Sequence, residues 1–192
     1  MIKGKAQATT HSLTPDSDET LVARLCEGEA EALDVLMARH ASAVVAFCAS
    51  YLDCDTAQDA AQETFVRVLV RCRTMRTTMR FKPWLYAIAH NVCMTMLRRH
   101  HLQASLAIEA LAETARALDE TAIDRDRRDA VLGEIDTLPT KYRDVMVLHY
   151  LSGLTCEETA AVMGLKTSAV KMRLRRAVLQ IRDSLARKGM LP

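Results

Sequence analysis

The stretch Leu154–Arg176 constrains the fold of this chain most, because two helix starts flank a turn within it. Thr155 followed three residues later by Glu158 is a capping box, which predicts a helix that begins at Thr155. Gly164 can adopt the left-handed backbone of a turn without steric cost. The Thr167-Ser168 pair then offers a cap for a second helix. This order predicts a helix-turn-helix.

The second helix of this motif has two different faces. Its apolar face should hold the helix against its neighbours and comprises Val170, Leu174, Ala177, Val178, Ile181 and Leu185. Its opposite face is basic and comprises Lys171, Arg173, Arg175, Arg176 and Arg182. A basic helix of this kind suits the major groove of DNA, although an isolated basic helix is more often only a solvated surface.

The composition indicates an all-α protein. Apolar residues make up 49% of the chain and aromatic residues only 4%, with 6 Gly and 4 Pro in 192 residues. We expect two helical domains joined by a flexible acidic linker. The expected boundaries are a disordered tail at 1–17, a first domain at 18–101, the linker at 102–124 and a second domain at 125–188.

Charge is distributed unevenly along the chain. Residues 13–63 contain eleven acidic side chains but only two arginines, Arg24 and Arg39. Residues 64–108 contain no acidic side chain and eight Lys or Arg. This polarity predicts one surface for a polyanion and another for a partner that tolerates carboxylates. The early carboxylates should bind one large partner, and the arginine-bearing helices should belong to two separate modules.

The six cysteines form no CxxC pair and most lie among apolar residues, so we interpret them as small buried side chains in a reducing cytoplasm. We expect no metal and no cofactor. A metal or redox sensor that uses cysteines with His149 or the His100-His101 pair is an open alternative without support from spacing. No apolar run is long enough for a membrane span, and the first residues lack a signal-peptide core.

Periodicity predicts further helices at about 18–28, 30–52, 56–73, 125–136 and 142–151, and one whose first turn contains Pro83. Trp84, the only tryptophan, should pack in the core, or else near a DNA-contacting loop. His149 lies in an apolar context, where a structural role is more probable than a ligand role.

Three segments in this order resemble the small bacterial sigma factors of the extracytoplasmic-function (ECF) type, in the sigma-70 family. Ala57–Phe65 looks like the region that docks on core RNA polymerase. Phe81–Asn91, followed by Leu97–Arg99, looks like the promoter-melting helix that reads the −10 element. Leu138–Val145 together with the helix-turn-helix looks like the domain that reads the −35 element. The likeness covers about residues 18–185.

The resemblance assigns roles to particular residues. Core polymerase would bind Asp59, Gln62 and Glu63. The −10 DNA would meet Arg71, Arg76, Thr77, Arg80, Lys82, Trp84, Asn91, Arg98 and Arg99. The −35 DNA would meet Lys171, Met172, Arg173, Arg175 and Arg176. The chain departs from the family pattern at Leu69, Thr95 and Lys166, where the family often has an aromatic residue, Asp and a capping Ser.

The resemblance therefore predicts a cytoplasmic sigma factor that is not an enzyme and binds no small-molecule substrate. Its partners would be core RNA polymerase, promoter DNA and an anti-sigma factor, which in this family is often membrane-bound and acts in stress or metal responses. A stand-alone helix-turn-helix regulator is the rival interpretation. It explains 154–176 equally well but leaves the acid-free stretch at 64–108 unexplained.

Overall fold

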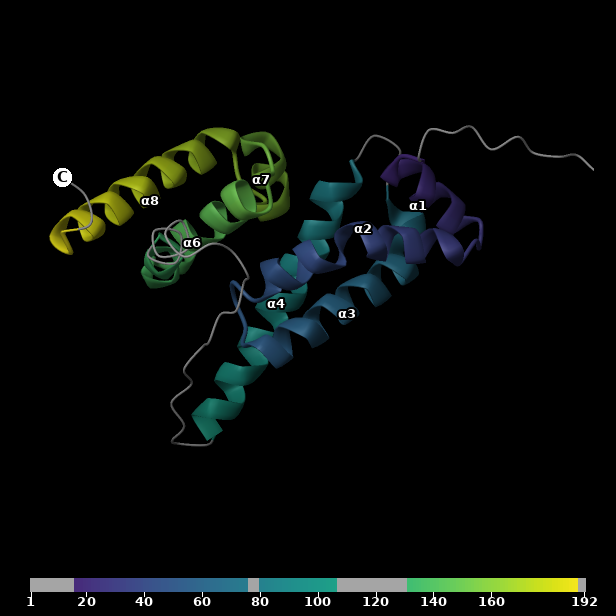
Figure 1. Cartoon of the computed structure of the whole chain (residues 1–192), viewed down its shortest axis with the longest axis horizontal. Coiled ribbons are helices and arrows are strands. Elements are labelled where there is room, and N and C mark those ends of the chain that lie inside the picture. The colour runs from purple at the N-terminus through teal and green to yellow at the C-terminus, as the bar shows by residue number, and fades with distance from the viewer. Residues whose placement is uncertain (1–15, 76–79, 107–130, 190–192) are drawn as a thin grey trace, which may run out of the picture.

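The computed structural model describes residues 16–75, 80–106 and 131–189, without the side chains of 100–106. All regular secondary structure in these ranges is helical, which confirms the all-α expectation. Figure 1 shows two groups of helices, α1 to α4 on one side and α6 to α8 on the other. The predicted tail at 1–15 and linker at 107–124 lie outside the described residues.

The first unit contains α1 (Asp18–Cys26), α2 (Glu31–Cys48), α3 (Cys54–Arg71) and α4 (Phe81–Leu106), with a short 3-10 helix at Cys72–Thr74. Helices α2, α3 and α4 pack against one another, and α1 packs on α2. The centre of this unit is mostly apolar, and its largest fully buried side chains include Leu21, Leu36, Val44, Val68, Phe81, Leu85 and Val92. This core fixes which faces of α3 and α4 remain exposed.

Short polar side chains set two helix starts in this unit. The Ser17 side chain accepts the Thr20 N–H, and the Asp53 side chain accepts the Thr56 N–H. The expectation that the tail extends to residue 17 is therefore wrong, because Ser17 is the cap of α1. Asp16 is also ordered, since its carboxylate lies 2.6 Å from the Arg24 guanidinium.

Helix α4 begins at Phe81 and contains Pro83 in its first turn, as predicted. It runs to Leu106, so residues 102–106 continue this helix and do not begin the linker. Trp84 is only 8% exposed, and its ring lies 6.2 Å from that of Phe81. Its expected DNA contact is therefore not supported by its position, which is in the core.

The second unit contains helical residues 131–137, α6 (Thr140–Met146), a π-helical turn at Val147–Leu151, α7 (Cys156–Met163) and α8 (Thr167–Arg187). Helices α6 and α7 both pack on α8. The predicted capping box is present, since Thr155 and Glu158 exchange side-chain to backbone hydrogen bonds. Gly164 has φ of 64°, which is the left-handed turn conformation.

Two details of α8 differ from the sequence-based expectation. Its N-cap is Lys166, which makes no side-chain cap hydrogen bond, so neither Thr167 nor Ser168 caps the helix. Val178 is 44% exposed and lies outside the buried face. The other five residues of the predicted apolar face are buried.

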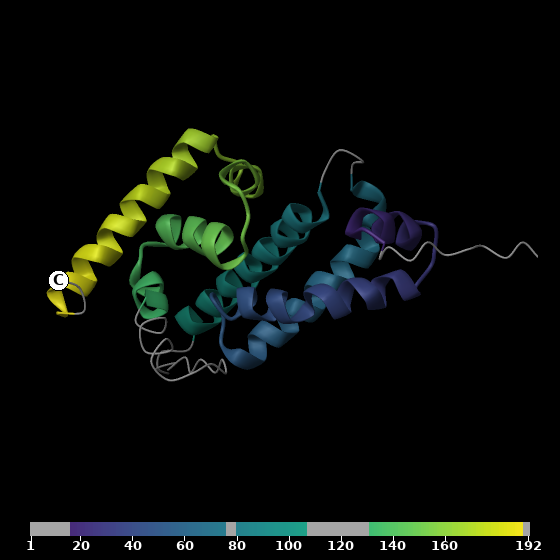
Figure 2. The same cartoon turned by 45° about the horizontal axis from the view of Figure 1, so that its top comes forward.

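The two units touch each other, contrary to the expectation of separate modules. Helix α4 packs against α7, and the buried apolar side chains of both units form one contiguous cluster. Figure 2 shows the green helices of the second unit lying beside the teal α4. No helix among the described residues is long and apolar enough to cross a bilayer.

Candidate polymerase and promoter interfaces

One exposed stripe on α3 carries all three residues predicted to bind polymerase. Asp59 and Gln62 are exposed, and Glu63 is half-buried. The stripe continues with Val66 and Leu69, which are 55% and 47% exposed. These positions are three or four residues apart and therefore share one helix face. The face is acidic at its start and apolar farther along.

The sequence analysis did not predict the apolar half of this stripe, although the pattern of apolar residues in α3 indicates it. In the second half of α3, apolar residues cover more of the helix circumference than one buried face requires. The structure buries Phe65 and Val68 and leaves Val66, Leu69 and Val70 in solvent. Exposed apolar side chains grouped on one helix mark a contact surface for a partner.

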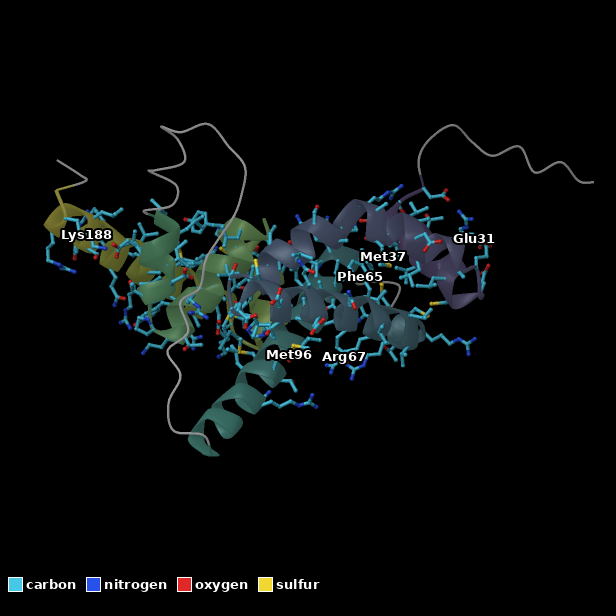
Figure 3. The ribbon with its side chains drawn as sticks, turned by 60° about the horizontal axis from the view of Figure 1, so that its bottom comes forward. Glu31, Met37, Phe65, Arg67, Met96 and Lys188 are labelled. Atoms are coloured by element: carbon cyan, nitrogen blue, oxygen red, sulfur yellow. The ribbon has the colours of Figure 1, made fainter. Side chains whose placement is uncertain are left out.

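Glu63 takes part in a groove that joins α3 to α4. Its carboxylate lies 2.8 Å from the Arg67 guanidinium nitrogen Nε. The groove has a volume of about 170 Å³ and is lined by Glu63, Arg67, Val92, Thr95, Met96 and Arg99. Figure 3 shows the labelled Arg67 and Met96 on this underside of the bundle. The α3 stripe predicted to bind polymerase and one end of the predicted −10 surface thus share a border.

The residues predicted for −10 DNA do not all lie in one described patch. Among them, the exposed side chains are Arg71, Arg80, Lys82, Asn91, Arg98 and Arg99. Arg76 and Thr77 lie outside the described residues. Arg71 ends α3, whereas the other five belong to α4 or immediately precede it. This surface therefore follows α4 along its length.

Helix α8 presents the residues predicted for −35 DNA. Lys171, Met172, Arg175 and Arg176 are exposed, and Arg173 is half-buried. Arg176 hydrogen-bonds the Tyr142 hydroxyl, and this contact lowers the pKa of Tyr142. The exposed Lys and Arg side chains make α8 a basic helix held by an apolar core, which suits the major groove.

Four cysteines form two close pairs that sequence spacing did not reveal. Cys26 of α1 contacts Cys72, and burial together with this neighbour raises the pKa of Cys26 to about 11. Cys93 of α4 contacts Cys48 of α2, and this hydrogen bond together with burial raises the pKa of Cys93. No three His, Cys, Asp or Glu side chains in the described ranges are placed to hold a metal ion.

His149 is oriented by the fold, as its apolar context predicted. Its Nδ1 lies 2.6 Å from the Leu154 carbonyl oxygen, and its ring packs edge-on against Tyr150 at 4.8 Å. This hydrogen bond ties the π-helical turn to Leu154, which precedes the N-cap residue of α7. The ring thus has a structural role.

Known proteins match this chain over both units. The model for "Sigma-70 region 2" matches residues 36–102, and the model for "Sigma-70, region 4" matches residues 128–181. The ECF RNA polymerase sigma-E factors of Escherichia coli and Salmonella typhimurium are each 30% identical over 172 residues, which cover 84% of this chain and 90% of theirs. This chain belongs to the ECF sigma factors of the sigma-70 family.

Further relatives agree with this assignment. A probable RNA polymerase sigma factor of Xanthomonas campestris pv. campestris, RfaY, is 30% identical over 71% of this chain, and the match spans 36% of the relative's length. The solved structure of CnrH in complex with the cytosolic domain of CnrY has a TM-score of 0.69 and 26% identity, covering 89% of this sigma factor and 98% of CnrH. RpoE of Bartonella quintana, solved with the anti-sigma factor NepR, shares the fold, with a TM-score of 0.66 and 20% identity over 80% of this chain and 96% of its own.

The two matched regions decide between the interpretations that the sequence left open. A stand-alone regulator would account for the helix-turn-helix of this sigma factor but not for region 2 in residues 36–102. Sigma factors are transcription initiation factors that bind core RNA polymerase and promoter DNA, and this chain is one of them.

Proposed function

We propose that this sigma factor directs core RNA polymerase to promoters through three helix faces and catalyses no reaction itself. The observation that carries the proposal is the separation of charge on exposed faces. The stripe on α3 begins with Asp59 and Gln62, whereas α4 and α8 expose Lys and Arg. Carboxylates near polymerase and cations near DNA give each partner one complementary surface.

The α3 stripe would bind a helical surface of the polymerase. Asp59 and Glu63 would meet cationic side chains, and Val66 with Leu69 would pack on apolar ones. A mixed face of this kind uses charge for orientation and apolar burial for affinity. Glu63 would exchange its contact with Arg67 for one with the polymerase, or would hold both.

The α4 surface would hold the −10 region. Arg71, Arg80, Lys82, Arg98 and Arg99 would neutralise phosphates, and Asn91 would reach an unstacked base of the nontemplate strand. Arg76 and Thr77 remain predictions for the same surface. Unstacking costs a few kcal/mol per base, so the free protein should not melt DNA without polymerase. Permanganate should therefore modify promoter thymines only when core enzyme is present.

Helix α8 would read the −35 element. Lys171, Met172, Arg175 and Arg176 would face base edges in the major groove, with Arg173 on a phosphate. Arg176 would have to leave the Tyr142 hydroxyl or keep that contact while it binds a base. The Tyr142 contact restricts the conformations of the guanidinium, which favours one orientation.

The relatives suggest a regulator. CnrH was solved with the cytosolic domain of CnrY, and this sigma factor resembles CnrH over nearly the whole chain. We propose that an anti-sigma factor, membrane-anchored or not, restrains this protein in the cytoplasm as part of a stress or metal response. The exposed apolar residues of α3 offer such a protein a surface that polymerase also needs.

Transcription in vitro with purified core polymerase tests the proposal. Asp59→Arg should abolish binding to core enzyme and transcription, because it reverses charge at the acidic start of the α3 stripe. Asp34→Arg is the matched control, since Asp34 is also an exposed carboxylate but belongs to α2 and not to the stripe. If the two variants are equally active, the α3 stripe does not bind polymerase. Equal promoter binding with and without polymerase would reject the sigma mechanism.

A further inference from the structure

Two thiols from separate helices meet at the edge of the first unit. Cys26 is the last residue of α1, and Cys72 begins the 3-10 helix that follows α3. Helix α1 packs on this 3-10 helix, and the two thiols lie within hydrogen-bonding reach of each other. Both side chains adjoin the same apolar core. The fold thus places side by side two cysteines that lie far apart in the sequence.

A third sulfur atom belongs to the same turn. Met75 is the C-cap residue of the 3-10 helix, and its backbone N–H donates to the Cys72 carbonyl oxygen at 3.1 Å. Residues three apart in a 3-10 helix lie one above the other, so Met75 follows Cys72 on one side of the turn. The Met75 side chain is half-buried against the core. Cys26, Cys72 and Met75 together define the sulfur cluster.

The sulfur cluster can be reached from solvent. Cys26 is half-buried, whereas Cys72 is buried. The other close pair of cysteines differs, because the side chains of Cys48 and Cys93 are both fully buried. A metal ion needs an entry path to its ligands. Of these two pairs, therefore, only Cys26 and Cys72 can take up an ion without opening the fold.

The donor atoms of the sulfur cluster select the kind of ion. Thiolate and thioether sulfur are soft ligands that favour Cu(I). A structural Zn²⁺ site needs four ligands, and within the described ranges no three His, Cys, Asp or Glu side chains are grouped to hold a metal ion. The nearby Arg73 cation stabilises a thiolate at Cys26, and the Glu27 carboxylate opposes it less strongly. The donors and the local charge thus suit a monovalent soft cation bound by thiolates.

We propose that the sulfur cluster binds a single Cu(I) ion, with the Cys26 and Cys72 sulfurs as thiolate ligands and the Met75 sulfur as a weaker third ligand. Each thiol loses its proton to solvent as its bond to the ion forms, and the copper keeps its oxidation state. The bound ion joins α1 to the turn that follows α3. This site does not depend on the function proposed above.

Titration of the full-length protein with Cu(I) under anaerobic conditions tests the proposal, with a coloured Cu(I) chelator as the competitor. Wild type should take a single Cu(I) ion per chain from the chelator. Cys26→Ser and Cys72→Ala should each weaken Cu(I) binding by more than about a hundredfold, because losing even an outer-shell partner of a metal site costs about ten- to a hundredfold in affinity. Met75→Leu should weaken Cu(I) binding less than either cysteine variant.

Two matched variants remove a thiol elsewhere. Cys156→Ser changes a cysteine that is half-buried, as Cys26 is, but belongs to α7, and Cys93→Ala changes the fully buried pair. Both control variants should bind Cu(I) as wild type does.

Thermal unfolding supplies a second readout. An ion that binds only the folded chain stabilises it, so Cu(I) should raise the melting temperature of wild type and of both controls but not of Cys26→Ser. Circular dichroism checks folding without copper. Cys26→Ser carries the test if Cys72→Ala does not fold, because Cys26 is the less buried of the two.

Several outcomes would overturn the proposal. They are a wild type that leaves all Cu(I) on the chelator, Cys26→Ser and Cys72→Ala variants that bind Cu(I) as tightly as wild type, or an equal loss of affinity in Cys156→Ser. A disulfide between Cys26 and Cys72 that forms in air, without Cu(I) binding under anaerobic conditions, would make the pair a redox site and not a metal site.

Discussion

The Glu19 carboxylate accepts a hydrogen bond from the backbone N–H of Phe81, with 3.0 Å between Oε1 and N, across 62 residues of sequence. Helix α1 therefore satisfies the N-terminus of α4, where backbone N–H groups have no partner within the helix. Phe81 is fully buried, and its ring lies 5.4 Å from that of His40. This contact fixes the point from which α4 presents the −10 surface.

Replacing Glu19 should therefore destabilise the first unit. Glu19→Ala removes a helix cap and should lower the free energy of unfolding by about 1 kcal/mol, measured by urea denaturation. Glu19→Gln keeps an oxygen that accepts the hydrogen bond of the Phe81 N–H, so its free energy of unfolding should fall less than that of Glu19→Ala. An alanine variant as stable as wild type would show that the hydrogen bond contributes nothing.

Leu69 should contribute to polymerase affinity without contributing to stability, because it is 47% exposed on the α3 stripe. Leu69→Asp should weaken binding to core polymerase at least fivefold, about 1 kcal/mol, in a fluorescence titration. Val35→Asp is the control, since Val35 is 40% exposed on α2, away from the stripe. A similar loss in both variants would contradict a specific role for the stripe.

Arg176 and Arg173 should differ in the kind of defect they cause. Arg176→Ala should reduce discrimination between −35 sequences by about 1 to 3 kcal/mol, because it removes a base contact. Arg173→Ala should weaken binding to all −35 sequences equally and reduce the salt dependence of binding by about one counterion. Binding of the polymerase holoenzyme to a −35 library at two salt concentrations separates these patterns. If Arg176→Ala weakens binding to all −35 sequences equally, Arg176 contacts a phosphate and not a base.

Cysteine reactivity should follow burial and pKa. Cys54 is exposed, whereas Cys48, Cys72 and Cys93 are buried. Because the thiolate is the reactive form, the raised pKa of Cys26, about 11, should slow its alkylation at neutral pH. Iodoacetamide followed by peptide mass spectrometry should label Cys54 first in the native protein. Rapid native labelling of Cys93 would contradict the packing of α2 on α4.

Acid should weaken the ion pair between Glu134 and Lys188, whose side chains hydrogen-bond each other. The Lys188 and Ser184 side chains lower the pKa of the buried Glu134 below its usual 4.5. A lowered folded-state pKa adds stability that is present above the unfolded pKa and is lost as the pH falls through the folded one.

The melting temperature of wild type should thus approach that of Glu134→Gln as the pH drops below 4.5. Glu157→Gln, at an exposed position, is the control for general acid effects. A difference in melting temperature between wild type and Glu134→Gln that stays constant with pH would show that the Glu134–Lys188 contact is not ionic.

Sequence patterns identified the two regions and much of the candidate site. The exposed positions of Asp59, Gln62 and the α8 cations follow from helical spacing, which a sequence displays directly. The sequence left Trp84 between the core and a DNA-contacting loop, because its apolar ring fits either place until its neighbour Phe81 is known. The apolar half of the α3 stripe was missed because burial of Phe65 and Val68 depends on how α2 and α4 pack.

The sequence by itself determined the helix-turn-helix, because a capping box and a glycine turn involve residues only a few positions apart. It also determined the segregation of charge, which is a property of the chain order. Only the tertiary structure decided that Glu19 caps α4 and that Cys26 meets Cys72. Those pairs join distant segments, and their meeting depends on the packing of whole helices, which no local spacing encodes.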